Sequence, residues 1–61
     1  MPVVHIDMWE GRDKETKKKL IESVADAIAS TLNIPDERIE IIINELPKEN
    51  WGKGRKQASE I

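Results

Sequence analysis

The 61-residue chain lacks cysteine altogether and has a single histidine, His5. Disulfides are therefore excluded, and one histidine cannot assemble a zinc cage. No apolar run approaches the roughly 20 residues of a membrane-spanning helix. The amino terminus also lacks a basic segment followed by a hydrophobic signal core. We therefore expect a cytoplasmic protein with no metal site and no membrane association.

The charges show no strong imbalance. Ten lysines and arginines face twelve aspartates and glutamates, interspersed along the chain, for a formal net charge of -2. Such a surface gives no general electrostatic reason to bind nucleic acid or anionic membranes. We expect small-molecule or protein partners instead.

The length also limits how the chain can be stabilised. One domain of this size buries only about 60% of the surface that its unfolded form exposes. Because disulfides and metals are excluded, association between subunits is the remaining means of stabilising the fold. We expect a single domain, residues 1–61, that oligomerises.

Hydrophobic patterning predicts a strand, a helix and a second strand. Residues 2–8 alternate between apolar and other side chains, as in a half-buried strand. Asp13 can cap a helix that Pro35 ends, and the β-branched run 39–46 predicts a second, largely buried strand. The apolar stripe of the helix recurs at spacings of three and four and comprises Leu20, Ile21, Val24, Ala27, Ile28 and Leu32.

This order predicts an α/β fold built from one β-α-β unit, with parallel strands and a right-handed crossover. Two strands and one helix leave one sheet face and both edges uncovered, so we expect an intersubunit sheet. Residues 47–61 carry Gly52 and Gly54 around Lys53, which predicts a turn or short hairpin. We expect this segment to be an arm that reaches onto a neighbouring subunit.

The beginning of the chain holds one unusual functional group. Met1 precedes proline and is normally excised in such a context, which would leave Pro2 with a free secondary amine. An α-amino group has a pKa near about 7.7–8.0, and an apolar pocket or a nearby cation lowers that pKa. Such an amine can serve as a general base near neutral pH. On composition alone, the alternative is an ordinary Met-Pro start without catalytic function.

Several features together resemble the 4-oxalocrotonate tautomerase (2-hydroxymuconate tautomerase) family of the tautomerase superfamily, over nearly the whole chain. The features are Pro2 leading directly into a strand, Glu10-Gly11-Arg12 opening the helix, a second strand that ends at Asn44-Glu45, and the pair Trp51-Gly52. The resemblance implies an isomerase that moves a proton within a 2-hydroxydienoate or 2-oxo-enoate such as 2-hydroxymuconate, in aromatic catabolism. It also implies a homohexamer, built as a trimer of dimers, that needs no cofactor.

The resemblance further implies roles for particular residues. Pro2 would be the catalytic base and then the acid. Arg12 would bind a substrate carboxylate and draw electron density toward it, for which a planar, permanently charged guanidinium is well suited. Trp51 would form the apolar wall of the pocket. The alternatives are a solvated arginine at a helix start and a tryptophan that packs the tail against a neighbour.

One position departs from the family pattern. Where the family has a second arginine on its second strand, this chain has Glu40. A carboxylate there would repel an anionic substrate group and raise the pKa of the proline amine, unless Arg38, Lys53 or Arg55 supplies positive charge. We assign Arg38 as the second substrate-binding residue, because it lies two residues from Glu40 and could reach the same side.

Other functions stay open at this point. A noncatalytic oligomeric binding module could use the same scaffold, as could a related proline-based dehalogenase, hydratase or decarboxylase. His5 is expected to be a structural or interface residue. The cationic loop 53–56 is expected to be solvated, or to lie at the rim of the active site.

Overall fold

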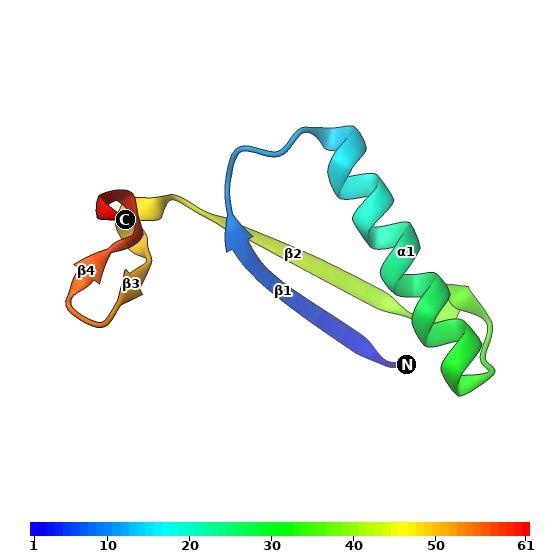
Figure 1. Ribbon diagram of the computed structural model, residues 1–61. Helices are drawn as coiled ribbons and strands as arrows, with labels where there is room; N and C mark the ends of the chain where they lie inside the picture. Colours follow the sequence, from blue (N-terminus) through cyan, green and yellow to red (C-terminus); the bar gives the residue numbers. More distant parts are fainter.

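A computed structural model describes residues 1–61, and it consists of a β-α-β body followed by a short hairpin arm (Figure 1). The elements of the body are β1 (Val3–Trp9), α1 (Lys14–Leu32), a 3-10 turn η1 (Asp36–Arg38) and β2 (Glu40–Leu46). Those of the arm are η2 (Lys48–Asn50), β3 (Gly52–Lys53), β4 (Lys56–Gln57) and η3 (Ala58–Glu60). The predicted α/β class, its element order and the hairpin are confirmed.

The two long strands are parallel neighbours, as the long helical connection predicts. Their register runs from Val3 opposite Glu40 to Trp9 opposite Leu46. The helix α1 lies across one face of the sheet, over the half-buried pairs Val4–Ile41 and Ile6–Ile43 (Figure 1). The other face, which carries His5, is open to solvent.

Local signals fix both ends of α1. The Oδ1 atom of Asp13 accepts a hydrogen bond from the amide of Thr16 at 2.9 Å, which satisfies one of the free donors of the first turn. This bond is the main cause that holds the pKa of Asp13 below its ordinary value of 3.8. At the other end Asn33 adopts a left-handed conformation with φ 56°, and Pro35 follows.

The face of α1 that meets the sheet differs in part from the predicted stripe. Leu20, Val24 and Ile28 are half-buried as predicted, and so are Ala25 and Ala29. The prediction was wrong for Ala27, Ile21 and Leu32, which are exposed, the last two to 39% and 56%. Rotation explains Ala27: at about 100° per residue, the half-buried residues 17, 20, 24, 25, 28 and 29 share one side of the helix, and Ala27 points away from the centre of that side. Ile21 and Leu32 lie on the same side as the half-buried residues, but the two-stranded sheet leaves them uncovered.

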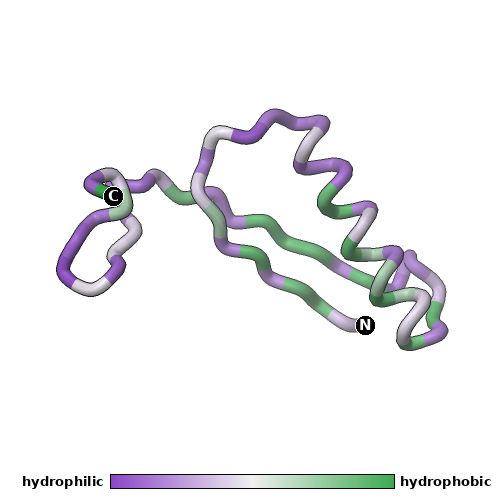
Figure 2. The backbone as a smooth tube through the Cα atoms, viewed as in Figure 1, coloured by the Kyte–Doolittle hydropathy of each residue, from purple (hydrophilic) through white to green (hydrophobic).

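An ion pair extends this contact toward the start of the helix. Lys17 Nζ lies 2.6 Å from Glu45 Oε1, and the two side chains are 30% and 27% exposed. The pair joins the first turns of α1 to the end of β2. Figure 2 shows where apolar and polar residues lie along the chain: apolar residues recur along both strands, and polar residues cover the β1–α1 loop and the tip of the arm.

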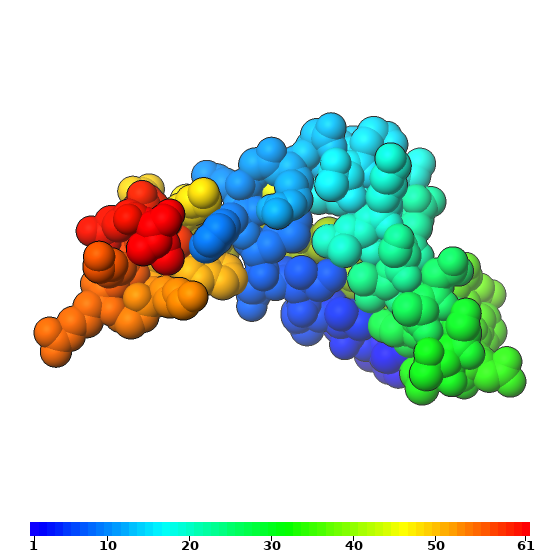
Figure 3. All heavy atoms as spheres, in the orientation of Figure 1, coloured from blue at the N-terminus to red at the C-terminus, as the bar shows by residue number.

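The arm is a small folded unit of its own. Gly54 takes φ 64° in the two-residue loop between β3 and β4, as a hairpin turn of this length requires. Ala58 is fully buried, and its amide donates to the carbonyl of Trp51 at 2.7 Å. The arm projects from the body as a separate lobe (Figure 3).

The chain is more open than a compact monomer of its size. Its accessible surface is 4956 Å², whereas a compact protein of 7.0 kDa exposes about 4,000 Å². Its radius of gyration is 14.4 Å, against about 10.5 Å for a compact domain of this length. Ala58 is the one fully buried residue. A single chain therefore lacks a closed hydrophobic core. No helix is both long enough and apolar enough to span a membrane.

Candidate active site

Pro2 lies at the first end of the sheet, immediately before β1. Its carbonyl accepts a hydrogen bond from the amide of Glu40 at 3.0 Å, which begins the ladder between the strands. Met1 precedes it and is 77% exposed. Arg38 ends η1, two residues before Glu40, and is exposed. Pro2 and Arg38 therefore lie at the same end of the molecule, with Glu40 beside them.

Arg12 lies at the opposite end, in the loop that joins β1 to α1. Gly11 has φ 126°, a conformation that glycine adopts without strain, and it turns the chain away from the strand. Arg12 Nη1 lies 3.4 Å from the carbonyl oxygen of Trp9, at the long limit for a hydrogen bond. The guanidinium is exposed, and most of its donors stay available to a ligand.

Trp51 lies at the same end of the sheet as Arg12, because both residues contact Trp9. The two indole rings meet edge to face, with centroids 5.9 Å apart and an interplanar angle of 77°. Lys48 Nζ lies 4.9 Å from the centroid of the Trp9 ring, within range of a cation–π interaction. We call Trp9, Trp51 and Lys48 the indole cluster. It fastens the arm to the end of β1.

Sequence reasoning missed Trp9 and Lys48. Trp9 follows the alternating run 2–8, and the alternation gives it no role. Its position at the end of a strand, next to Glu10-Gly11-Arg12, could have indicated that it lies beside Arg12. Lys48 had no such signal, because its contact with Trp9 joins residues far apart in the sequence.

Positive charge at the indole cluster is uncompensated. The one ion pair in the structure is Lys17–Glu45, so neither Arg12 nor Lys48 has a carboxylate partner. Trp9 Nε1 is shielded from solvent and has no acceptor, so the ring is held by packing and by its contacts with Trp51 and Lys48. Two free cations beside apolar rings suit an anionic, planar ligand.

Within one chain the predicted residues form two separate groups. Arg12 and Trp51 lie together at one end of the sheet, and Pro2 and Arg38 lie at the other. The seven residues of β1 separate the groups by about 20 Å at a rise of about 3.3 Å per residue. A single chain therefore does not bring Pro2 together with Arg12 and Trp51.

His5 belongs to neither group. His5 is exposed on the open face of the sheet. Farther along that face, Asn44 Nδ2 donates to Asp7 Oδ1 at 3.1 Å across the two strands. No three histidine or carboxylate side chains lie close enough together to hold a metal ion.

Comparison with known proteins agrees with this fold over the whole chain. A family model described as tautomerase enzyme matches residues 2–58. The 2-hydroxymuconate tautomerase of Pseudomonas sp. (strain CF600) is 39% identical over 61 residues, which cover 100% of this chain and 97% of that relative.

Solved structures show the same architecture. TomN, a 4-oxalocrotonate tautomerase homologue of the tomaymycin biosynthetic pathway, matches with a TM-score of 0.93 at 30% identity, over 97% of this chain and 91% of that one. A heterohexamer 4-oxalocrotonate tautomerase from Chloroflexus aurantiacus J-10-fl matches with a TM-score of 0.92 at 31% identity, over 100% and 98%. The chain therefore belongs to the tautomerase family and is an isomerase of its 4-oxalocrotonate tautomerase group.

Proposed function

We propose that the chain moves a proton within a 2-hydroxydienoate or 2-oxo-enoate, with Pro2 as general base and then general acid. The observation that carries the proposal is the pairing of an unpartnered Arg12 with the Trp9–Trp51 rings at one end of the sheet. The name and full-length similarity of the Pseudomonas 2-hydroxymuconate tautomerase support 2-hydroxymuconate as the substrate with which to begin.

Removal of Met1 is a condition of this mechanism. While Met1 is attached, the nitrogen of Pro2 belongs to an amide and has no basic lone pair. Met1 is 77% exposed and outside the strand, so its bond to Pro2 is open to processing. The mature residues 2–61 would then form the single tautomerase domain.

The proton shift balances without an external reactant. The freed amine takes the proton of the 2-hydroxyl group, and the electrons of that O–H bond form the 2-oxo carbonyl. The double bonds shift along the chain, and the protonated amine returns a proton to the distal carbon of the conjugated system. Arg12 binds the carboxylate toward which electron density moves, and the indole rings exclude water. No cofactor is required, because no electrons leave the substrate.

The separation of the two groups favours a site that is shared between subunits. Pro2 of one subunit would meet Arg12 and Trp51 of another, because about 20 Å of β1 separates them within one chain. The open shape and the uncovered sheet face supply surface for this association. We propose a homohexamer; the Chloroflexus relative, a heterohexamer, supports the number of subunits in the assembly.

Glu40 makes the charge of the site unusual. Its amide donates to the carbonyl of Pro2, and a carboxylate on this residue would favour the protonated form of the freed amine. Arg38 is at the same end of the sheet as Glu40, whereas Lys53 and Arg55 are in the arm at the other end. Within one chain Arg38 is therefore the residue placed to offset the negative charge of Glu40. Lys48 adds a second cation beside Arg12, so a dicarboxylate can still find two positive partners.

The test follows ketonisation of 2-hydroxymuconate by ultraviolet absorbance, after intact mass has established that the chain begins at Pro2. We expect Pro2→Ala and Arg12→Ala each to lower kcat/KM by about a hundredfold or more. Equal rates in all three proteins would contradict the proposal and favour a noncatalytic binding module.

A mixing experiment tests the shared site. The two inactive variants are unfolded together and refolded as mixed oligomers, in which some sites combine an intact Pro2 with an intact Arg12 from another subunit. Activity should reappear on mixing. If each variant has the hexamer's size but the mixture stays inactive, the site lies within one chain or elsewhere.

A further inference from the structure

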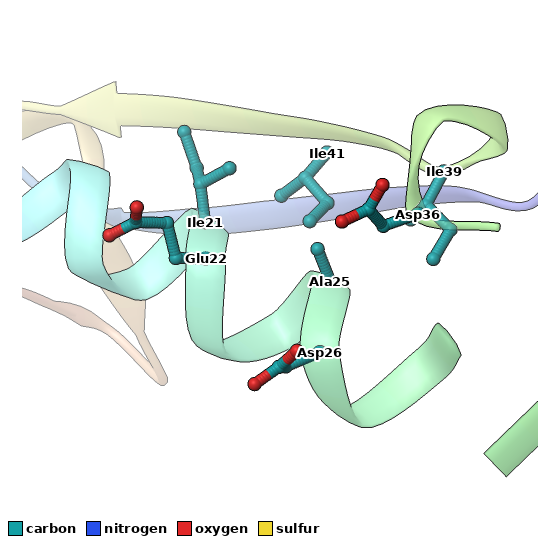
Figure 4. A pocket seen from close by; sticks show the side chains of 7 residues that line it. All are labelled: Ile21, Glu22, Ala25, Asp26, Asp36, Ile39 and Ile41. Atoms are coloured by element: carbon teal, nitrogen blue, oxygen red, sulfur yellow. The ribbon is translucent and has the colours of Figure 1, made fainter. Parts of the chain in front are cut away.

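A groove runs between α1 and the beginning of β2, at the end of the sheet that is remote from the arm. Its volume is about 480 Å³, and it is lined by Ile21, Glu22, Ala25, Asp26, Asp36, Ile39 and Ile41. In Figure 4, Ile21 and Ala25 point from the helix toward Ile41, and Asp36 projects from η1 beside it. In the same view Asp26 points away from Ile41, so the groove has an apolar floor and carboxylates at its rim, and we call it the acidic groove.

The charge of the acidic groove is of one sign. Glu22, Asp26 and Asp36 line it, and no lysine or arginine does. None of the three carboxylates takes part in an ion pair, since the one such pair lies elsewhere. Arg38 is close in sequence to Asp36 but does not line the groove. The groove is suited to a ligand with several positive charges and aliphatic surface.

The tip of the arm has the complementary properties. Lys53, Arg55 and Lys56 surround Gly54 in the β3–β4 hairpin, all are exposed, and none has a carboxylate partner. The acidic residues nearest along the chain, Glu49 and Glu60, pair with none of these cations, and Glu60 instead accepts the amide of Gln57 at 2.7 Å within the arm itself. Lysine and arginine also carry long aliphatic stems that pack on apolar surface while their charges stay in water.

The tip cannot reach the groove of its own chain. The groove is at the beginning of β2, whereas the arm leaves from its end, about 20 Å away, and extends farther in the same direction (Figures 1 and 3). The Trp9–Trp51 contact fastens the arm at that far end. An occupant from this protein must come from another copy.

We propose that the cationic arm tip of one subunit docks in the acidic groove of a neighbouring subunit. Three positive charges then face three carboxylates, and the stems of Lys53 and Arg55 cover the apolar floor around Ile21 and Ile41. This contact rests on the homo-oligomer proposed above, and it identifies which surfaces meet in it. The arm thereby connects the subunits whose ends form the shared active site.

Charge reversal with rescue tests the contact. The tip variant is Lys53→Glu with Arg55→Glu, and the groove variant is Asp26→Lys with Asp36→Lys. We expect each to raise the subunit concentration for half-assembly by about tenfold in sedimentation equilibrium at low salt. The four substitutions combined in one chain should return it to within about threefold of the original, because tip and groove are again opposite in charge.

The control variant is Lys18→Glu with Lys19→Glu, which makes the same change of net charge as the tip variant on a part of α1 outside the groove. It should leave assembly unchanged. Failure of the combined variant to recover, with helix content intact by circular dichroism, would overturn the docking.

Crosslinking gives a second readout that does not depend on charge. Because the chain has no cysteine, Arg55→Cys with Asp26→Cys introduces the only two thiols. A short bismaleimide should join subunits into covalent ladders, whereas either single variant should give dimers at most. An oligomer of native size without such ladders would refute the docking and leave the oligomer itself standing. A 7.0 kDa monomer in sedimentation would refute both.

Discussion

Replacing Trp9 by leucine should lower the activity of the proposed active site, although neither Pro2 nor Arg12 is changed. The substitution removes the edge-to-face contact with Trp51, worth about 0.5–1.5 kcal/mol, and the contact with Lys48, worth about 0.5–1 kcal/mol at an exposed position. No hydrogen bond is lost, because Trp9 Nε1 has no acceptor. The sum is about 1–2.5 kcal/mol.

If the full free energy of these contacts is lost from transition-state binding because Trp51 is no longer held in place, kcat/KM for 2-hydroxymuconate should fall about five- to seventyfold. Trp9→Phe keeps an aromatic ring and serves as the matched control, with an expected loss of about threefold or less. The chain has two tryptophans and no tyrosine, so in either variant the intrinsic fluorescence reports Trp51 alone.

The two readouts should change together. Trp51 emission should shift to longer wavelength in Trp9→Leu, as the ring loses its apolar neighbour and meets more water. Wild-type kcat/KM in Trp9→Leu, with the emission of Trp51 the same as in Trp9→Phe, would refute the inference that Trp9 positions Trp51.

Three further predictions concern the charged side chains. Glu40→Arg should raise kcat/KM for dicarboxylates by about tenfold, because reversing a unit charge about 6 Å from a carboxylate in water-like surroundings is worth about 1.4 kcal/mol. Unchanged turnover in the absorbance assay would mean that another cation already binds the second carboxylate. In a double-mutant cycle of unfolding at fixed protein concentration, Lys17→Met and Glu45→Gln should show a coupling free energy of about 1 kcal/mol, because the two side chains are only 30% and 27% exposed. A coupling of zero would contradict a stabilising role for this ion pair. The lowered pKa of Asp13 means that its cap stabilises the fold above pH 3.8 and is lost as the pH falls through the folded-state pKa. Asp13→Asn, which caps without titrating, should flatten this part of the curve of melting temperature against pH, and an identical curve would contradict that assignment.

Much of the fold could be predicted because its signals are local. Alternation placed the first strand at residues 2–8, against Val3–Trp9 in the structure, and Asp13 marked the start of α1. The run 39–46 matches β2 to within one residue. The rotation of the helix was harder to predict, because Ala25, Ala27 and Ala29 are equivalent by hydropathy and only contact with the sheet distinguishes them.

The site was predictable only in part, for a physical reason. The family pattern singles out Pro2, Arg12 and Trp51 but contains no information about which of them are close in one chain. The contact of Trp9 with Lys48 forms only when the beginning of the arm packs on the end of β1, and it joins residues distant in sequence. The spacing of about 20 Å between the two groups is likewise a consequence of the length of β1.

The most direct measurement compares ketonisation of 2-hydroxymuconate by two preparations of the same chain, one that begins at Pro2 and one that retains Met1, each verified by intact mass. The two differ only in whether the nitrogen of Pro2 is an amine or an amide. Catalysis by Pro2 predicts turnover in the first preparation and loss of about a hundredfold or more in the second. Equal turnover in the two preparations would contradict a catalytic amine at Pro2.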